Sequence, residues 1–477
     1  MKLLTRLVGP RTRRALLVVI GAVMVLGAAY MLPRFVADFG FIVVPLVIVG
    51  FLALLALFVV PVDVLPALAL TLYVLIPPRV LPQDGPLGAL PLTSIVLVVW
   101  GFRRLILSEG NPERTDQERK PAPFKLAALL FGLAFFVWAA LSLLRTPDVQ
   151  TSLGWLISFT AGALLPLAIG SATKEAAGIR DMWLLLGGWL GAYAVVEAVV
   201  RINPLWGTLY DALGLPDAQH WAVYRASASF GHPLFAALFF AVACTLAIGN
   251  WLTSRSKGAM AAAVFSGLGL VATISRGALL GAAIAVAFAY IAALLIRGEK
   301  RWGRFGFIGL AAVIAVIGLF QFDAFAARSD SREGQLSSGA RDTALWVTFR
   351  AADLTSWFGS GAGTSGITGR LFADVVIESA LLQLVIGLGL PGLILFSLIL
   401  ASAFLHALSQ GAVGPAAALL TYAICISTFN ALDAVRPMHL LLGCLLILTL
   451  NPPGDDSPVE PDLTPAARKV SRADATH

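Results

Sequence analysis

Arginine residues on one predicted side of a membrane are the clearest chemical feature of this chain. When its apolar segments are laid through a bilayer, all seven lysines fall on one side, and every basic residue on the other side is an arginine. A guanidinium binds phosphate through a planar fork of donors, whereas a lysine ammonium acts as a point charge. The pattern therefore predicts that an anionic, phosphate-bearing substrate binds on the arginine side.

Two of these arginines stand close to predicted membrane boundaries. Arg276 lies in the Thr273–Gly277 turn, which leaves almost no loop between two apolar segments, and Arg225 shortly precedes another apolar segment. An ionisable residue at the depth of Arg276 is costly and indicates a functional site. Snorkelling of its side chain to lipid headgroup phosphates is the alternative. Gly277 and Gly281 predict close helix packing whatever Arg276 does.

Two other ionisable residues open apolar segments. His232 follows Arg225 at the start of such a segment, where it is either a proton carrier or an interfacial polar residue. Glu378 begins the apolar segment 378–405 and faces the predicted arginine-bearing loop. A carboxylate in this position serves either as a base or as the ion-pair partner of an arginine.

The elements that must position these residues are transmembrane helices. Of 477 residues, 58% are hydrophobic and 13% are charged, and the mean hydropathy is +0.86. This composition leaves too little polar surface for a soluble fold of this size. The continuous apolar runs are typical of helices, which need roughly 20 residues to cross the hydrocarbon core, and not of alternating barrel strands. We predict an all-α polytopic membrane protein with 12 to 14 transmembrane helices.

Fourteen candidate spans follow one another along almost the whole chain. They lie near 15–31, 40–60, 62–77, 91–107, 125–144, 153–170, 182–200, 231–250, 258–274, 277–296, 304–321, 378–405, 412–430 and 435–450. The second and third could form a re-entrant pair around Pro61, which would leave twelve. Cys244, Cys425 and Cys444 all fall within spans, where a lone thiol behaves as a small hydrophobe. The sequence therefore indicates neither a disulfide nor a zinc site.

Basic residues in the connecting loops predict the orientation. The N-terminal segment and every basic-rich loop, such as that around 297–304, fall on the cytoplasmic side. The net charge of +7 is then mainly a topology signal and does not indicate nucleic-acid binding. The first apolar run is expected to stay as a signal anchor. Residues 1–450 form a single transmembrane domain in this prediction, and the polar, Pro-rich segment 451–477 is a disordered cytoplasmic tail.

Two predicted extracytoplasmic loops, 201–230 and 321–377, are too long to be simple connectors. The second contains an amphipathic stretch at 341–357, followed by glycines. The apolar residues on one side of the stretch are Leu345, Trp346, Phe349 and Leu354, and the glycines are Gly359, Gly361, Gly363 and Gly366. We predict a short helix against the membrane surface and then a flexible turn. An interfacial cap without a chemical role is the alternative for this helix.

Residues 180–405 carry short motifs in a distinctive order. Arg225 and a Phe-Gly-His-Pro element at 230–233 precede a Ser-Arg-Gly-Ala hairpin at 275–278. The long outer loop then leads to Glu378 and to a Gly-Leu-Pro-Gly run at 389–392. In the order and spacing of these motifs the chain resembles the O-antigen ligase and Wzy-type polysaccharide polymerase superfamily.

The resemblance implies a membrane-embedded glycosyltransferase that uses neither a metal nor another cofactor. Such enzymes transfer a glycan from undecaprenyl diphosphate, with inversion, to an acceptor sugar hydroxyl. Fixed arginines would stabilise the charge that develops on the diphosphate leaving group. By this resemblance the catalytic residues are Glu378, Arg276 and Arg225, and the substrate-binding residues are Arg341, Arg350, Ser275 and His232.

One position departs from the ligase pattern. Ligases carry a histidine, usually followed by asparagine, where this chain has Glu378 and Ser379. The departure favours a polymerase of O-antigen or exopolysaccharide repeats over a ligase that transfers to lipid A. An O-antigen ligase with another acceptor is the alternative. Glu378 would either activate the acceptor hydroxyl or orient the arginines.

Proteins of two other classes would also place charges in a membrane. A secondary transporter for an anionic lipid or sugar should show paired broken helices in repeated halves, with charges near the bilayer midplane. A flippase or scaffold of an assembly complex would not need two long outer loops. The preferred prediction places the protein in a bacterial inner membrane, with both termini cytoplasmic and the active site outside. Its expected partners are membrane lipids, a polysaccharide flippase and a chain-length regulator.

Overall fold

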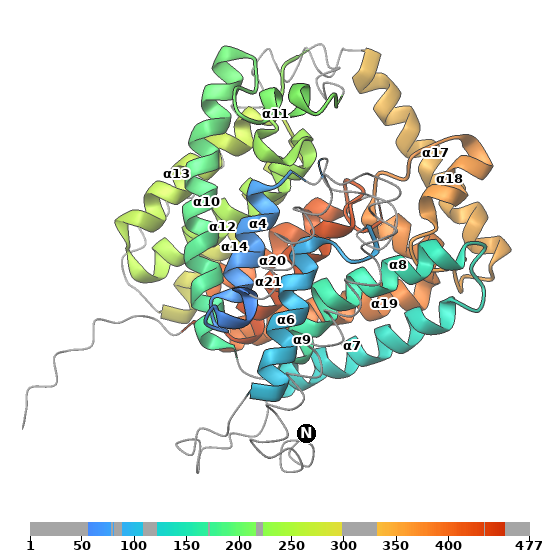
Figure 1. Cartoon of the computed structure of the whole chain (residues 1–477), viewed down its shortest axis with the longest axis horizontal. Coiled ribbons are helices and arrows are strands. Elements are labelled where there is room, and N and C mark those ends of the chain that lie inside the picture. The colour runs from blue at the N-terminus through green and yellow to red at the C-terminus, as the bar shows by residue number, and fades with distance from the viewer. Residues whose placement is uncertain are drawn as a thin grey trace, which may run out of the picture.

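The computed structural model describes residues 56–77, 80, 88–107, 122–169, 172–215, 223–297, 332–433 and 435–453 (Figure 1). Every regular element in these ranges is a helix, as predicted. The candidate spans near 15–31 and 304–321, most of the one near 40–60, and nearly all of the predicted tail 451–477 lie outside the described residues.

Six of the described helices are long and apolar enough to cross a membrane. They are α7 (Pro123–Ser142), the continuous run of α8, η3 and α9 (Val149–Ala168), α10 (Thr173–Val200), α12 (Pro233–Ser254), α14 (Arg276–Arg297) and α19 (Ala380–Ser409). Shorter helices are α4 (Leu65–Leu75), α6 (Leu92–Leu107), α13 (Lys257–Ala272), α20 (Val413–Ile426), η5 (Arg436–Met438) and α21 (His439–Leu450). Each candidate span that lies within the described ranges coincides with one of these helices. The fold is that of a polytopic helical membrane protein.

Small residues bring the central helices into backbone contact. A Cβ added to Gly191 of α10 would lie 2.2 Å from the carbonyl oxygen of Phe265 in α13. A Cβ added to Gly249 of α12 would lie 2.3 Å from Cα of Gly414 in α20. Such contacts are typical of membrane helices. An apolar helix surface is as stable against lipid tails as against another helix, so close packing of small residues is needed for the helices to associate. The helix α12 lies at the centre of the bundle, because 72% of its most apolar segment is buried by other parts of the protein.

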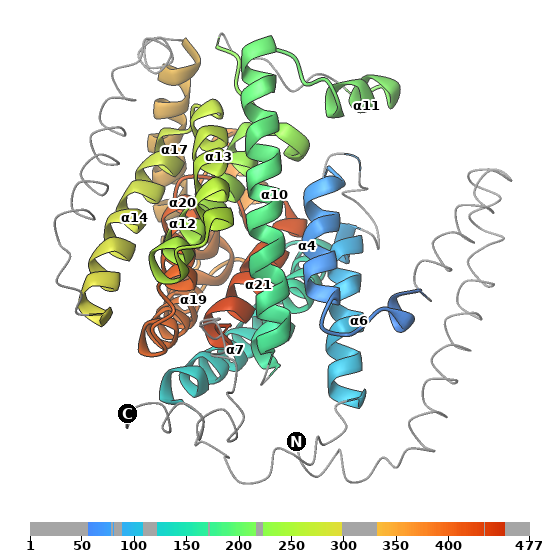
Figure 2. The ribbon, with the colours of Figure 1, turned by 90° about the vertical axis from the view of Figure 1, so that its left-hand side faces the viewer.

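The helices alternate in direction, so their ends gather at two ends of the bundle. In Figure 2, α10 runs through the height of the bundle, and α11 (Trp206–Ala212), which follows it, lies at the upper end. The start of α12, the turn from α13 to α14, the start of α19 and the end of α20 also lie at this upper end. Ala226 contacts Ala272, Gly277 contacts Thr428, and Ala380 contacts Phe429, so these segments meet there. The predicted site residues at these positions are therefore brought to one end of the molecule.

Helix α17 (Arg332–Leu354) is longer than the short helix that we predicted. Its small residues face the bundle, where Ala344, Val347 and Ala351 pack with Val375, Ile377 and Ile386. The large residues of the predicted apolar side are exposed instead, and they are Leu345, Trp346, Phe349 and Leu354. An exposed apolar face on a helix at the upper end is in keeping with a position against a membrane surface.

The glycine cluster after α17 was wrongly predicted to be a flexible turn. Gly359, Gly361 and Gly363 have φ values of 81°, 114° and 75°. The N–H groups of Ser360 and Gly361 donate to the carbonyls of Ile386 and Gly387 at 2.9 and 2.8 Å. The glycines are needed because the chain has positive φ and approaches α19 closely. The segment then continues into a second helix, α18 (Ser365–Ala373), which the sequence did not indicate.

The Gly-Leu-Pro-Gly run at 389–392 interrupts α19. Gly389 has φ 70° and ψ −171° inside the helix, and Pro391 has no N–H to donate. The carbonyls that the break releases have partners, since that of Leu388 accepts a hydrogen bond from Trp138 Nε1 at 2.7 Å. Together with the bonds from Ser360 and Gly361, this satisfies backbone groups that could not remain bare in a membrane.

Candidate functional site

Arg225 and Arg276 lie on touching segments at the upper end of the bundle. The side chain of Arg225 is only 2% exposed, and its Nε donates to the carbonyl of Thr273 at 3.0 Å. The next residue, Ala226, donates its N–H to the carbonyl of Ala272 at 3.0 Å. The segment before α12 therefore runs along the turn that leads to Arg276. Two arginines that the sequence placed in separate motifs belong to one local structure.

The turn between α13 and α14 contains only Thr273–Ser275, which confirms the predicted tight hairpin. Ile274 has a φ of 51°, a left-handed conformation that is costly for a β-branched residue. Strain of this kind persists where the surroundings hold it, and it is common at functional sites. Ser275 is buried, and its carbonyl accepts the N–H of Leu279 at 3.0 Å. Arg276 is thereby fixed as the first residue of α14.

The end of α20 connects the arginine turn to the Glu378 segment. A Cβ added to Gly277 would lie 2.9 Å from Thr428 Oγ1, so α14 begins directly against this end of α20. The neighbouring carbonyl of Phe429 accepts the N–H of Ala380 at 3.1 Å. Gly277, next to Arg276, and Ala380, two residues after Glu378, therefore both contact the turn Thr428–Phe429. We call the region around Arg225, Arg276, Glu378 and the turn Thr428–Phe429 the arginine site.

Glu378 stands half-buried at the entrance to α19. Ser379 caps the helix from the position before it, where its Oγ accepts the N–H of Leu382 at 3.4 Å. Among the described residues, no hydrogen bond or ion pair engages the Glu378 carboxylate. The ion pair with an arginine, one of the two roles expected for Glu378, is thus not formed within the part of the chain that the structure describes, and the carboxylate can act on a ligand.

Glu197 of α10 supports the arginine-bearing segment and was missed by the sequence analysis. Its side chain is fully buried. One carboxylate oxygen accepts the N–H of Ser227 at 3.0 Å and the hydroxyl of Tyr224 at 3.1 Å, and the other accepts the N–H of Ala228 at 2.8 Å. All three donors lie within three residues of Arg225. A single carboxylate in the apolar second half of α10 was the signal that could have revealed it.

Asn203 fastens the loop after α10 to the same segment. Its Nδ2 donates to the carbonyl of Ala228 at 2.8 Å, while its Oδ1 accepts the hydroxyl of Tyr193 at 2.6 Å. The same oxygen accepts the N–H of Trp206 at 3.1 Å, at the start of α11. The described parts of the first long loop are therefore built around the segment that carries Arg225.

His232 has a structural role at the start of α12. Its Nδ1 accepts the N–H of Leu234 at 3.2 Å, which caps the helix and leaves the proton of the neutral ring on Nε2. The ring lies 5.0 Å from that of Phe235, which is 6.2 Å from the ring of Phe429. His232 is thus an interfacial capping residue at the edge of the arginine site, and its predicted contact with substrate stays a prediction.

Arg341 and Arg350 are exposed on α17. That helix packs on Val375 and Ile377, directly before Glu378, and so braces the Glu378 segment. The contacts of α17 with Val375 and Ile377 do not by themselves bring either arginine to Arg225 or Arg276. Their role in binding substrate therefore stays a prediction, whereas the arginine site contains Arg225, Arg276 and Glu378.

A second polar cluster, also missed, lies around Asp433 between α20 and α21. Its carboxylate accepts the N–H of Ser365 at 3.3 Å and also the Ser365 hydroxyl. Burial raises the pKa of Asp433, and the hydrogen bonds from Ser365 oppose that rise. The backbone N–H of Asp433 donates to Gln383 Oε1 at 3.3 Å, and Gln383 Nε2 donates to the carbonyl of Ile377 at 3.1 Å. The cluster therefore ties α18 to the residue before Glu378.

The same cluster extends to α8 through His439. One ring nitrogen, Nδ1, lies 3.0 Å from Ser158 Oγ, and the other, Nε2, lies 2.8 Å from the carbonyl of Leu432. That carbonyl also accepts Trp155 Nε1 at 3.0 Å. Because each of these polar atoms bonds to another part of the protein, the cluster acts as a support for the loop between α20 and α21.

Comparison with known proteins gives a partial match. The arginine/ornithine antiporter ArcD of Halobacterium salinarum is 27% identical to this chain over 168 residues. The match covers 35% of this chain and 33% of the antiporter, so the chain spans about a third of the length of the curated relative that it matches. No protein-family model matches the chain.

Proposed function

We propose that this protein is a membrane-embedded inverting glycosyltransferase that polymerises oligosaccharide repeats carried on undecaprenyl diphosphate, in O-antigen or exopolysaccharide synthesis. The observation that carries the proposal is the contact between the Arg225 segment and the Arg276 turn. It brings two guanidinium groups, each a planar fork of N–H donors, to one end of the bundle. A diphosphate presents several anionic oxygens, and paired arginine forks suit it better than single point charges do.

The reaction needs two actions from the arginine site, stabilisation of the leaving group and removal of a proton. The acceptor hydroxyl attacks the anomeric carbon of the donor sugar, and the bond from that carbon to the diphosphate oxygen breaks with its electron pair on the diphosphate. Arg225 and Arg276 stabilise this developing charge. Glu378, whose carboxylate has no partner among the described residues, accepts the proton of the hydroxyl. The proposal assigns charge stabilisation to arginines and requires no metal or other cofactor.

We place the upper end of the bundle on the extracytoplasmic side of a bacterial inner membrane, with 12 to 14 spans and both termini in the cytoplasm. The lysines within the described residues support this orientation, because Lys125, Lys174 and Lys257 lie near the starts of α7, α10 and α13, at the opposite end. A polysaccharide flippase would then deliver the lipid-linked repeats to the arginine site, and a chain-length regulator would act on the growing polymer.

The partial match to an antiporter favours a secondary transporter as the second candidate function. Interrupted helices in transporters offer free backbone groups to substrates and ions. The break in α19 does not offer its released carbonyls in this way, because Ser360, Gly361 and Trp138 already bind those of Ile386, Gly387 and Leu388. The buried Glu197 carboxylate is likewise bound by backbone N–H groups. We therefore rank transport second.

Sizing of lipid-linked glycans tests the proposal. Cells that lack this protein should lose long polysaccharide chains and accumulate single lipid-linked repeats, which mild acid releases for analysis on a gel. Full-length polymer left on undecaprenyl diphosphate would contradict polymerisation and indicate the ligase alternative. Unchanged glycans, together with arginine–ornithine exchange by the purified protein in proteoliposomes, would indicate the transporter.

A further inference from the structure

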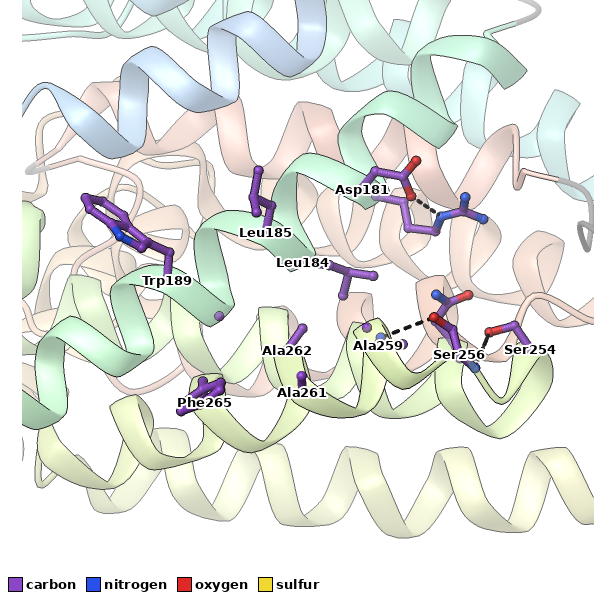
Figure 3. A pocket seen from close by; sticks show the side chains of 14 residues that line it. Asp181, Leu184, Leu185, Trp189, Ser254, Ser256, Ala259, Ala261, Ala262 and Phe265 are labelled. Carbon is purple, nitrogen blue, oxygen red and sulfur yellow. Dashed lines mark hydrogen bonds and ion pairs between the residues drawn. The ribbon is translucent and has the colours of Figure 1, made fainter.

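A cavity opens between α10 and α13 on the half of the molecule away from the arginine site (Figure 3). Its volume is about 630 Å³, and residues from α10, the end of α12 and the first half of α13 line it. The cavity takes no part in the proposed transfer reaction. Its location and its distribution of polar groups point to a bound molecule of another kind.

The shape of the cavity follows from the way α10 and α13 cross. At Gly191 the helices touch, with an added Cβ only 2.2 Å from the carbonyl oxygen of Phe265. One turn earlier, a Cβ added to Gly188 would lie 3.5 Å from its nearest neighbour, Cα of Ala262. The helices therefore diverge towards the start of α10 and leave a wedge between them. In a membrane helix pair, such a wedge is open to lipid.

One end of the cavity is apolar. Leu185, Trp189 and Phe265 line it and are 63%, 51% and 44% exposed, so their side chains face the surroundings of the bundle and not its core. Figure 3 shows Trp189 and Phe265 at one end, on α10 and α13 respectively. A surface of this composition suits an acyl chain.

The other end of the cavity is polar. Figure 3 shows Asp181 on α10 and, across from it, Ser254 and Ser256, all toward the end away from Trp189 and Phe265. Arg180 also lines this end, and its Nε lies 2.9 Å from Asp181 Oδ1. The hydroxyl of Ser254 donates to the carbonyl of Asn250 at 2.9 Å, whereas Ser256 Oγ accepts the N–H of Ala259 and keeps its own O–H for another acceptor. An arginine fork and a serine hydroxyl that line the same cavity are donors that suit a phosphate group. The cavity is thus polar at one end and apolar at the other, as a phospholipid has a polar headgroup and apolar acyl chains.

The charges around the polar end favour an acidic lipid. The described basic residues near this end include Arg103, Arg104, Lys174, Arg180, Arg255 and Lys257, and the acidic ones include Asp63, Glu175 and Asp181. Glu175 is fully buried, and its carboxylate lies 2.5 Å from Arg104 Nη2. The excess of cations is therefore at the surface, where it attracts anionic headgroups.

We propose that the cavity is a binding site for one acidic phospholipid of the phosphatidylglycerol class. The phosphate lies between Arg180 and the hydroxyl of Ser256, and an acyl chain lies along Leu185, Trp189 and Phe265. A second copy of the chain would fit the site less well, because a protein surface would have to fill a narrow wedge that runs from polar to apolar. A free phosphate would leave the apolar half empty. The inference does not depend on the proposed transfer reaction.

The amount of each lipid that the purified protein retains measures binding at the cavity. The purified protein is exposed to mixed vesicles of equal phosphatidylglycerol and phosphatidylcholine, extracted in mild detergent, and analysed by native mass spectrometry. The wild type should retain one phosphatidylglycerol in preference to phosphatidylcholine. Arg180→Gln should weaken retention of phosphatidylglycerol about fivefold, the effect of one basic residue on an anionic lipid. Ala261→Phe should remove both lipids by filling the apolar wedge, since Ala261 lines the cavity and is exposed.

Two matched variants serve as controls. Arg370→Gln makes the same charge change at an exposed site on α18, and Ala401→Phe adds the same bulk at an exposed alanine of α19. Both should retain lipid as the wild type does. Ala261→Leu repeats the filling test with a smaller side chain if the phenylalanine variant does not fold. Equal retention of the two lipids by the wild type, or unchanged retention by both cavity variants, would overturn the proposal. So would a dimer that Ala261→Phe dissociates, because a second copy would then occupy the wedge.

Discussion

Arg225 Nε donates a hydrogen bond to the carbonyl of Thr273 at 3.0 Å, across 48 positions of sequence. The guanidinium of Arg225 is thereby oriented by the protein backbone before any substrate arrives. Orientation in advance is what makes fixed charges effective, because no reorganisation is needed as charge develops in a reaction. The same contact joins the Arg225 segment to the turn that positions Arg276, so changes in either segment should affect both arginines.

Arg276→Lys tests whether the planar fork is needed at the start of α14. Lysine keeps the charge but loses bidentate geometry. If Arg276 binds the diphosphate, loss of that contact should cost roughly 2 to 4 kcal/mol of transition-state stabilisation, or about 30-fold to nearly 1000-fold in rate. Polymer length and amount in cells would measure the loss, with membrane abundance of the protein checked by blotting. Arg370→Lys, at an exposed position of α18, is the matched control. Wild-type activity of Arg276→Lys would make Arg276 a headgroup anchor instead.

Glu197→Gln tests the support beneath the Arg225 segment. The buried carboxylate accepts two backbone N–H groups, those of Ser227 and Ala228, and an amide would turn a donor towards one of them. We expect a loss of about 1.5–3 kcal/mol of stability, the usual value of hydrogen bonds to a charged group. A fall in the unfolding temperature in detergent would measure it. Tyr224→Phe removes only the hydroxyl bond to Glu197 and should have a smaller effect. Equal stability of Glu197→Gln and wild type would show that the carboxylate is not a support.

Gly359→Ala and Gly366→Ala should have opposite effects. At Gly359 the φ of 81° is unfavourable for alanine, and the added Cβ would lie 2.4 Å from the carbonyl oxygen of Gly387. We expect a destabilisation of at least about 1–3 kcal/mol from the backbone strain alone. Gly366 lies in α18 with nothing within 4 Å of an added Cβ, so alanine should be neutral or stabilise by about 0.5–1 kcal/mol. Unfolding temperatures of the two variants decide this. Equal unfolding temperatures for the Gly359→Ala and Gly366→Ala variants would contradict this expectation and support the flexible turn predicted from the sequence.

The spans could be predicted from the sequence because a membrane helix needs only a continuous apolar run of sufficient length. The tight turn before Arg276 could also be predicted, since so few residues separate two such runs. Residues whose role depends on distant partners could not be found in this way. Asp433 binds Ser365 from 68 positions away, and neither residue lies in a motif that would indicate the other. The glycines at 359–363 were misjudged for a related reason, because glycine indicates both flexible turns and close backbone contact, and only the approach of α19 distinguishes the two.

The orientation of the bundle is the last prediction, and the proposed site depends on it. Thr208 of α11 and Lys257 of α13 are both exposed, at opposite ends of the molecule. Cysteine at position 208 should react with a membrane-impermeant thiol reagent in intact spheroplasts, whereas cysteine at 257 should react only after permeabilisation. The native Cys244, Cys425 and Cys444 are buried, so the unsubstituted protein should give little background. The reverse labelling pattern would place the arginine site in the cytoplasm, where lipid-linked repeats delivered by a flippase would not reach it.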